Sequence, residues 1–300
     1  MQAHSPGIIF ALVMEEEKEV TALLNLIEDP DPDIFEAVSS RIISYGPHII
    51  PNLENLWENT ADNTVLERIE LLIHKLYFSG LTEDFKQWAQ SPHQELLPGA
   101  LLVAKFLYPN LHTAKVIQDV ERLRRNIWLE LNNYLTPLEQ ITVFNNIFYN
   151  YFGLRGDYNH YEKPNEFLIN KIIESKKGNQ TGNGVLYLLL SEMLDIPVKL
   201  IPIPDQFVLG YFKPNAQNEQ EKLHLNIDFF IDPVTGQAFT HNDLTNYFNR
   251  TNVKISPALF KPCSNKKVIQ KLLSDLSKCY TNDDKMYLRE EINELICLLD

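Results

Sequence analysis

Cysteine is scarce in this chain and confined to its end. The three cysteines are Cys263, Cys279 and Cys297, so residues 1–262 contain no thiol. An odd number of cysteines without a short spacing indicates neither a disulfide framework nor a zinc site. The usage is typical of a protein from a reducing cytoplasm. A cysteine nucleophile in the first 262 residues is therefore excluded.

Long hydrophobic runs are also missing. The longest run, residues 8–14, is far shorter than the roughly 20 residues that a membrane-spanning helix needs. It does not fit a signal peptide, because no Lys or Arg precedes it and three acidic residues follow it, where a small-residue cleavage site should be. We expect a cytoplasmic protein with no membrane partner. Met14 is a candidate native start, because the helical pattern begins there.

Positive charge is outweighed by negative charge. The chain has 27 Lys and Arg residues against 40 Asp and Glu residues, a net charge of −13 at pH 7. An acidic surface repels phosphate backbones, which disfavours nucleic-acid partners. The small basic cluster of Arg122, Arg124 and Arg125 is interpreted as a solvated helix face, with a docking patch as the alternative. The 44% of apolar residues suffices for a packed core and excludes disorder of the whole chain.

Residues 1–98 predict an α-helical domain similar to HEAT repeats. Apolar residues recur at helical spacing, and the turn sequences Asp29–Pro32 and Gly46–Pro47 separate the predicted helices. Asp33 is expected to cap the second helix, and Phe85 and Trp88 to mark a short fifth one. Because repeats need about three copies for stability and one copy is convincing here, two interpretations stay open. The domain is either a simple helical bundle or a repeat-type surface that binds peptides.

Residues 99–245 predict an α+β core. Helical periodicity continues to Tyr151, a loop is expected over residues 156–165, and helices follow over residues 166–177 and 185–194. Antiparallel strands are then expected over residues 198–203, 206–212 and 223–231, with a short last strand near Phe239. Residues 246–300 predict a C-terminal tail that ends in a helical hairpin, at about 265–280 and 283–299.

Two potential ligand sites are weak. The glycine-rich stretch Lys176–Gly184 lacks the Gly-Lys-Ser/Thr ending of a phosphate-binding loop and follows a helix rather than a strand. Its backbone amides could still hold a small anion at a helix start. His224, Asp228 and Asp232 share one face of a predicted strand, but the two aspartates would stand roughly 13 Å apart, too far for one ion. We expect no metal and no cofactor.

A series of short motifs in the middle of the chain resembles a known family. They are Gly99–Ala104, Tyr108–Asn110, Phe144–Asn146, Phe152–Gly153, Tyr161, Pro164–Asn165, Leu168, Asn170, Lys177–Asn179, Val185–Leu188, Leu194–Pro197, Pro204–Leu209, Phe230–Pro233 and Gly236. Their order and spacing resemble the SirB-like branch of the transglutaminase-like superfamily, over about residues 99–245. The resemblance implies a bacterial protein with a papain-like core, an acidic helical segment before it and tetratricopeptide-type helices after it, here shortened to one hairpin.

The resemblance also implies where a catalytic triad would lie. In active members a Cys at a helix N-terminus attacks an acyl group, helped by a strand His that an Asp on the next strand orients. The Cys position corresponds to Gln180, the His position to Gln206 and the Asp position to Asp232. The branch generally lacks the Cys and often keeps the His, so this chain departs further.

A chain with two carboxamides at these positions is expected to be a pseudoenzyme. An amide is not a nucleophile, and Gln206 has no pKa near 7 with which to accept a proton. Gln180, Thr181, Gln206 and Asp232 are then candidates for a polar cleft that binds an unknown protein or peptide partner. One alternative is a cryptic acyl hydrolase or transferase that uses Thr181, with His160, His224 or His241 as the base. Another is a helical-repeat adaptor.

Overall fold

The computed structural model describes residues 18–158, 161–203, 206–213, 226–251, 256–281 and 285–300. It divides into two compact units, one up to Asp84 and one from Phe85 to Asp300. The sequence placed boundaries at residues 98 and 245, whereas the structure divides within a long helix and shows no division at 245. The apolar run 8–14 and the candidate start at Met14 lie outside the described residues. None of the described helices is long and apolar enough to cross a membrane.

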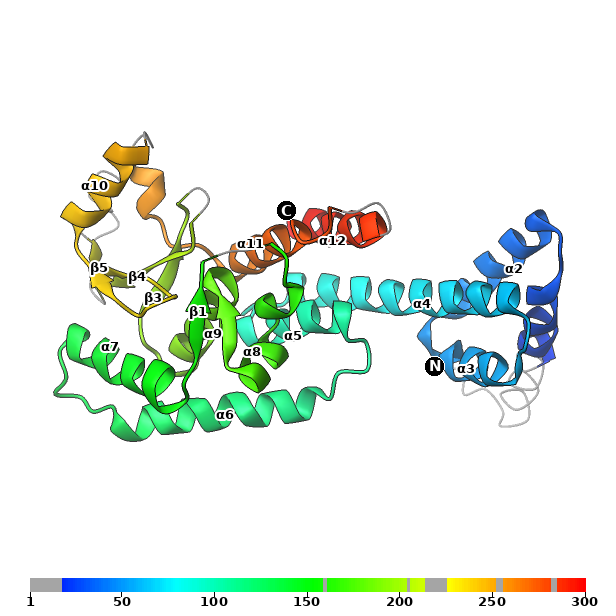
Figure 1. Ribbon diagram of the computed structural model, residues 1–300, viewed down its shortest axis with the longest axis horizontal. Helices are drawn as coiled ribbons and strands as arrows, with labels where there is room; N and C mark the ends of the chain where they lie inside the picture. Colours follow the sequence, from blue (N-terminus) through cyan, green and yellow to red (C-terminus); the bar gives the residue numbers. More distant parts are fainter. Residues whose placement is uncertain (1–17, 159–160, 204–205, 214–225, 252–255, 282–284) are drawn as a thin grey trace, which may run out of the picture. The chain divides into compact units, whose positions relative to one another are not determined.

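The first unit is all-helical. It comprises helical residues 18–25, a 3-10 turn Leu26–Glu28, α2 (Pro32–Tyr45), a 3-10 turn Pro47–Ile49, α3 (Ile50–Asn59) and the start of α4 (Asn63–Gln90) (Figure 1). Its own hydrophobic core includes Ile27, Ile42, Leu53, Ile69 and Leu72. Most residues of the predicted helical stripes are therefore confirmed as buried, but Ile34 and Trp57, which the helical spacing placed inward, are exposed.

Two details of the first unit correct the sequence-based expectations. Asp31, not Asp33, caps α2, and its side chain accepts a hydrogen bond from the Asp33 backbone nitrogen at 2.9 Å. The short fifth helix is not separate, because α4 runs without a break for 28 residues. Gly80 does not interrupt α4; a Cβ there would meet the Pro47 ring at 2.9 Å, so the glycine permits close packing.

Helices make up most of the second unit. They are α5 (Leu96–Leu107), α6 (Thr113–Glu130), α7 (Pro137–Asn145) with a π-helical extension (Asn146–Tyr151), a 3-10 turn (Pro164–Phe167), α8 (Ile169–Ser175), α9 (Gln180–Met193), α10 (His241–Thr251), a second 3-10 turn (Pro257–Phe260), α11 (Asn265–Ser277) and α12 (Met286–Leu298). α9 is the central helix, buried from Gln180 to Ser191 and packed against α5, α8 and α11. α11 and α12 pack on each other, as the predicted hairpin requires. Because α11 contacts α5 and α9, the tail is part of this unit's core.

A small antiparallel sheet completes the second unit. Its strands are β3 (Val198–Ile201), β4 (Val208–Phe212), β5 (Ile227–Ile231) and β6 (Ala238–Phe239), hydrogen-bonded in that order. The antiparallel sheet is thus confirmed, and with the helices it gives the expected α+β class. A strict alternation of apolar and polar residues along the third predicted strand is not confirmed. The β4–β5 register shifts at Tyr211 and Phe212, and the consecutive residues Phe230 and Ile231 are both buried. Residues 223 and 225 lie outside the described part of the chain.

One short strand pair was missed. β1 (Arg155–Asp157) pairs in parallel with β2 (Lys177–Asn179), where the sequence predicted a loop and a glycine-rich stretch. Three-residue strands carry no alternating pattern, so only the tertiary structure could reveal them. β2 leads directly into α9 and fixes where that helix begins.

Candidate functional site

The N-terminus of α9 is fixed by a capping asparagine. The Asn179 side chain accepts a hydrogen bond from the Gly182 backbone nitrogen at 2.8 Å, and Gln180 is the first residue of the helix. This is the position that the resemblance assigns to a catalytic cysteine. α9 begins earlier than the predicted residue 185, because this cap extends it through the glycine-rich stretch.

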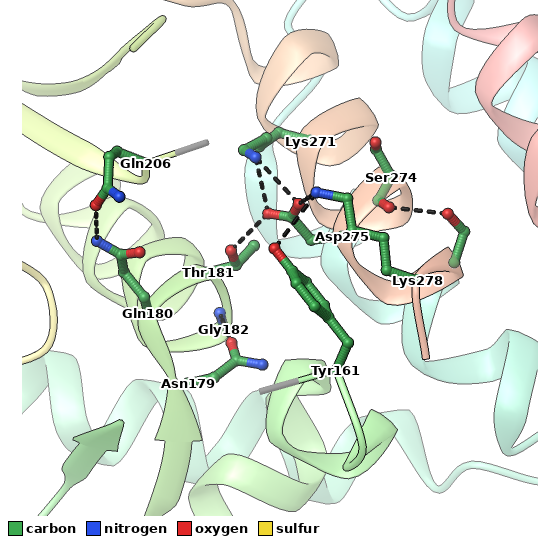
Figure 2. Close-up of polar contacts among 11 residues, drawn as sticks. Tyr161, Asn179, Gln180, Thr181, Gly182, Gln206, Lys271, Ser274, Asp275 and Lys278 are labelled. Carbon is green, nitrogen blue, oxygen red and sulfur yellow. Dashed lines mark hydrogen bonds and ion pairs between the residues drawn. The ribbon is translucent and has the colours of Figure 1, made fainter. Parts of the chain in front are cut away.

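A close contact places the loop before β4 beside the N-terminal part of α9. A Cβ on Gly184 would overlap the ring of Phe207, so only glycine lets this ring pack against the N-terminal part of α9. Phe207 is fully buried. Its neighbour Gln206 lies beside Gln180, and the Gln180 Nε2 donates a hydrogen bond to the Gln206 Oε1 at 3.2 Å (Figure 2).

Asp232 lies at the same edge of the sheet. Leu209 of β4 pairs with Ile231 of β5, so the residues just before β4 and just after β5 emerge together. The Asp232 carboxylate accepts hydrogen bonds from the Val234 nitrogen and the Thr235 hydroxyl, both at 2.9 Å, and from the Tyr158 hydroxyl at 3.4 Å. Asp232 therefore stabilises the turn that follows β5. In the described part of the chain it forms no hydrogen bond with either glutamine.

All three triad-equivalent residues line one cavity of about 540 Å³. Its walls are Tyr158, Gln180, Gln206, Val208, Asp232, Gln237, Ala238, Phe239, Asp243, Leu244 and Tyr247. α10 contributes Asp243, Leu244 and Tyr247, which were not predicted from the sequence. The only signal was the spacing Thr240-x-x-Asp243, a capping box that marks a helix start.

The described residues of the cavity walls carry charge of one sign only. Asp232 and Asp243 are the charged ones among them, and this described lining contains no Lys, Arg or His. Hydrogen bonds from the backbone and hydroxyl of Thr240 lower the pKa of Asp243. The negative charge of Asp232 raises the pKa of Tyr158, so this phenol stays protonated at neutral pH.

Thr181 does not belong to this cleft. Its side chain is fully buried, is absent from the cavity lining, and donates a hydrogen bond from Oγ1 to the Asp275 Oδ2 at 2.8 Å. Asp275 is itself buried and forms ion pairs with Lys271 at 3.0 Å and Lys278 at 2.9 Å (Figure 2). Thr181 thus links α9 to α11, and its assignment as a cleft residue is wrong, because the helix turns its side chain away from Gln180.

The described part of the chain offers no histidine or cysteine that could replace the missing groups in this cavity. The His241 Nε2 lies 2.9 Å from the Ile227 carbonyl oxygen, and His160 and His224 lie outside the described residues. Burial raises the pKa of Cys263 to about 11 and that of Cys279 to about 12, so both are protonated at neutral pH. Cys297 is exposed on α12. Among the described residues, no group of three His, Cys, Asp or Glu side chains could hold a metal ion.

Comparisons with known proteins point to one family. The chain is 22% identical over 205 residues to Protein SirB1 of Salmonella typhimurium, which covers 67% of this chain and 72% of SirB1. It is also 22% identical over 204 residues to a UPF0162 protein of Vibrio cholerae, with the same shares. No solved structure matches the chain. Residues 114–274 match the family model of the transglutaminase-like superfamily, to which the chain therefore belongs.

Proposed function

We propose that this protein is a non-catalytic member of its family that binds a peptide segment in the cavity between α9, β4 and α10. The hydrogen bond between Gln180 and Gln206 carries the proposal. It joins two carboxamides at the positions where active relatives are expected to hold a thiol and an imidazole. Neither carboxamide can attack a carbonyl carbon or accept a proton at neutral pH.

The glutamine pair is well suited to bind a peptide group. Their mutual hydrogen bond leaves the Gln180 Oε1 as an acceptor and the Gln206 Nε2 as a donor. A peptide unit offers the complementary N–H and C=O. Asp232 and Asp243 disfavour an acidic ligand, so we propose a neutral or cationic segment as the occupant. A cavity of about 540 Å³ has room for a few residues of such a segment.

Selection from a randomised heptapeptide display library tests this proposal. We expect enriched peptides to be rich in Lys or Arg, poor in Asp and Glu, and to bind Gln206→Trp at least about tenfold more weakly, because the indole fills the cavity. Gln118→Trp, at an exposed position on α6, is the matched control and should bind like the unmodified protein. Equal binding to all three proteins would refute the cleft as the binding site.

Restoring a thiol at residue 180 and an imidazole at residue 206 tests whether these two positions correspond to a catalytic dyad. In a Cys297→Ser background, Gln180→Cys should give a thiol with a pKa below about 8.5, because it sits at a helix N-terminus. Adding Gln206→His should lower it further by ion-pair formation. The rate of iodoacetamide alkylation against pH measures both values. An unchanged thiol pKa in the double variant would show that residues 180 and 206 do not form a dyad.

An activity assay of the unmodified protein tests directly whether it is non-catalytic. We expect no hydrolysis of activated esters or amides above the background rate. The hydrolase alternative requires turnover that Thr181→Val abolishes and Gln118→Trp leaves intact. The buried position of Thr181 speaks against it.

A specific observation favours one second candidate, the helical adaptor. The first unit has its own cavity of about 600 Å³, lined by Glu54, Trp57, Glu58, Glu70, Ile73, His74 and Tyr77. Trp57 is 42% exposed and donates a hydrogen bond to Glu70 at 3.1 Å. Enriched library peptides that lose binding on Trp57→Ala, but not on Gln206→Trp, would move the binding function to this unit.

A further inference from the structure

A second cavity of the large unit lies between α6, α8 and the connection from α5 to α6. It has a volume of about 650 Å³, and all its lining residues belong to the ranges 107–122 and 170–176. None of its lining residues belongs to the cleft described above. Its size is within the range of sites for small organic molecules.

This cavity is cationic in a strongly acidic protein. Four cations, Lys115, Arg122, Lys171 and Lys176, line it together with two carboxylates, whereas the whole chain has a net charge of −13. The carboxylates are already engaged in ion pairs, Asp119 with Arg122 at 3.2 Å and Glu174 with Lys171 at 2.9 Å.

Two of the lysines, Lys115 and Lys176, form no ion pair within the described residues. Each interacts electrostatically with a carboxylate, Lys115 with Glu174 and Lys176 with Asp119, but both carboxylates are already paired with other cations. The Lys176 ammonium lies over the ring of Phe152, at 5.4 Å from the ring centre. The Lys176 backbone has a left-handed conformation and ends α8. Burial and the positive charge of Arg122 lower the pKa of Lys176. Four cations against two carboxylates leave the cavity with an excess of positive charge, and a bound anion would relieve the remaining repulsion.

The backbone adds to the positive potential. α6 begins at Thr113 beside the cavity, has no acidic residue in its first turn and receives no side-chain cap. The partial positive charge of a helix N-terminus there favours an anion. A neutral group is also unsatisfied, because the Asn170 Oδ1 is buried and has no hydrogen-bond partner among the residues that the structure describes. A buried acceptor of this kind needs a donor, such as a hydroxyl group of a ligand.

We propose that this cavity binds a small organic phosphate monoester that carries a hydroxyl group. The phosphate would lie between Lys115, Lys176 and the start of α6, and the hydroxyl would donate to the Asn170 Oδ1. The two unpaired ammonium groups match the charge of a dianion, and the remaining volume accommodates a short polar carbon chain. This binding site is independent of the peptide cleft.

Calorimetric titration with glycerol 3-phosphate, inorganic phosphate and glycerol tests the proposal. We expect saturable binding of both phosphates, tighter for glycerol 3-phosphate, and none of glycerol. The double variant Lys115→Gln, Lys176→Gln should weaken both at least about tenfold, because it removes two charge-assisted contacts. Lys75→Gln, Lys86→Gln removes the same charge from exposed positions outside the cavity and should bind normally.

Asn170→Ala separates the two parts of the site. We expect it to weaken glycerol 3-phosphate severalfold and to leave inorganic phosphate unchanged. Retention of the thermal unfolding midpoint in the absence of ligand confirms that the variants are folded. Absence of saturable phosphate binding, or equal binding by the two lysine double variants, would overturn the proposal. Loss of both ligands on Asn170→Ala would overturn the role assigned to the hydroxyl group.

Discussion

Gln180 and Thr181 are neighbours in the chain but occupy different surroundings. Gln180 lines the cleft, whereas Thr181 points to α11 and donates to the buried carboxylate of Asp275. The carboxylate is stabilised further by Lys271 and Lys278. A residue that resembled a surrogate nucleophile in the sequence is therefore a structural link between two helices.

Thr181→Val tests this structural role. The change keeps the shape of the side chain but removes one hydrogen bond from a buried carboxylate, so we expect a loss of about 1–3 kcal/mol in the free energy of unfolding. Urea denaturation measures it. Thr142→Val, on an exposed face of α7, is the control and should cost less than about 0.5 kcal/mol. An unchanged stability of the Thr181 variant would contradict the burial of this contact.

At the scale of elements, the start of α9 and the loop before β4 are held together by packing as well as by the hydrogen bond between Gln180 and Gln206. Gly184 leaves room for the ring of Phe207, and this contact places Gln206 beside Gln180. The cleft therefore depends on a glycine that does not line it.

Gly184→Ala should destabilise the protein although alanine is the better helix former. The gain in helix propensity is about 1 kcal/mol, but the methyl group would overlap the buried ring and cost about 1–3 kcal/mol or more. Denaturant unfolding of Gly184→Ala, Phe207→Leu and the double variant gives the coupling. We expect the double variant to be more stable than the sum of the single effects indicates. Additive effects would show that these residues do not touch.

Helix caps make the stability of single elements depend on pH. The capping box of α7 joins Thr136 and Glu139, and hydrogen bonds from the Thr136 backbone and hydroxyl hold the pKa of Glu139 below its usual 4.5. A carboxyl group with a lowered pKa in the folded state stabilises fully above its unfolded value, and this stabilisation is lost as the pH falls through the folded value. Glu139→Gln keeps the hydrogen bonds without the charge.

Thermal unfolding of both proteins from pH 7 to pH 3 checks this. We expect the unmodified protein to have the higher midpoint above about pH 4.5, and the difference to disappear at lower pH. A difference that grows as the pH falls would contradict the lowered pKa of Glu139.

At the scale of the whole molecule, the acidic charge dominates, although basic residues gather at one cavity. Arg122 contributes to the cationic cavity, but the chain as a whole carries a net charge of −13. Long-range repulsion of polyanions therefore coexists with a local site that suits a small anion.

Binding of a fluorescent 20-base-pair DNA duplex tests whether the long-range repulsion of polyanions outweighs the local attraction of the basic residues. We expect a dissociation constant weaker than about 100 μM at physiological salt, because non-specific affinity requires an excess of cationic contacts. Fluorescence anisotropy is the measurement. Micromolar binding that weakens steeply with added salt would show that the basic cluster is a nucleic-acid interface.

Local patterns in the sequence predicted much of the fold. The antiparallel strands β3 to β5 and most of the helical stripes of the first unit were predicted from local patterns, and the structure contains both. The carried-over positions Gln180, Gln206 and Asp232 also meet at one cavity. The single helix α4 and the strand β1 were missed, because their ends depend on packing and pairing with distant residues.

The amino-acid sequence by itself determined the absence of a thiol and an imidazole at residues 180 and 206, since side-chain chemistry does not depend on the fold. It also determined the acidic charge. Only the tertiary structure decided that Thr181 faces Asp275, that Asp243 joins the cleft and that Lys115 approaches the end of α8. The reason is physical: a contact between residues far apart in the chain depends on how helices and strands pack, and no local pattern records that packing.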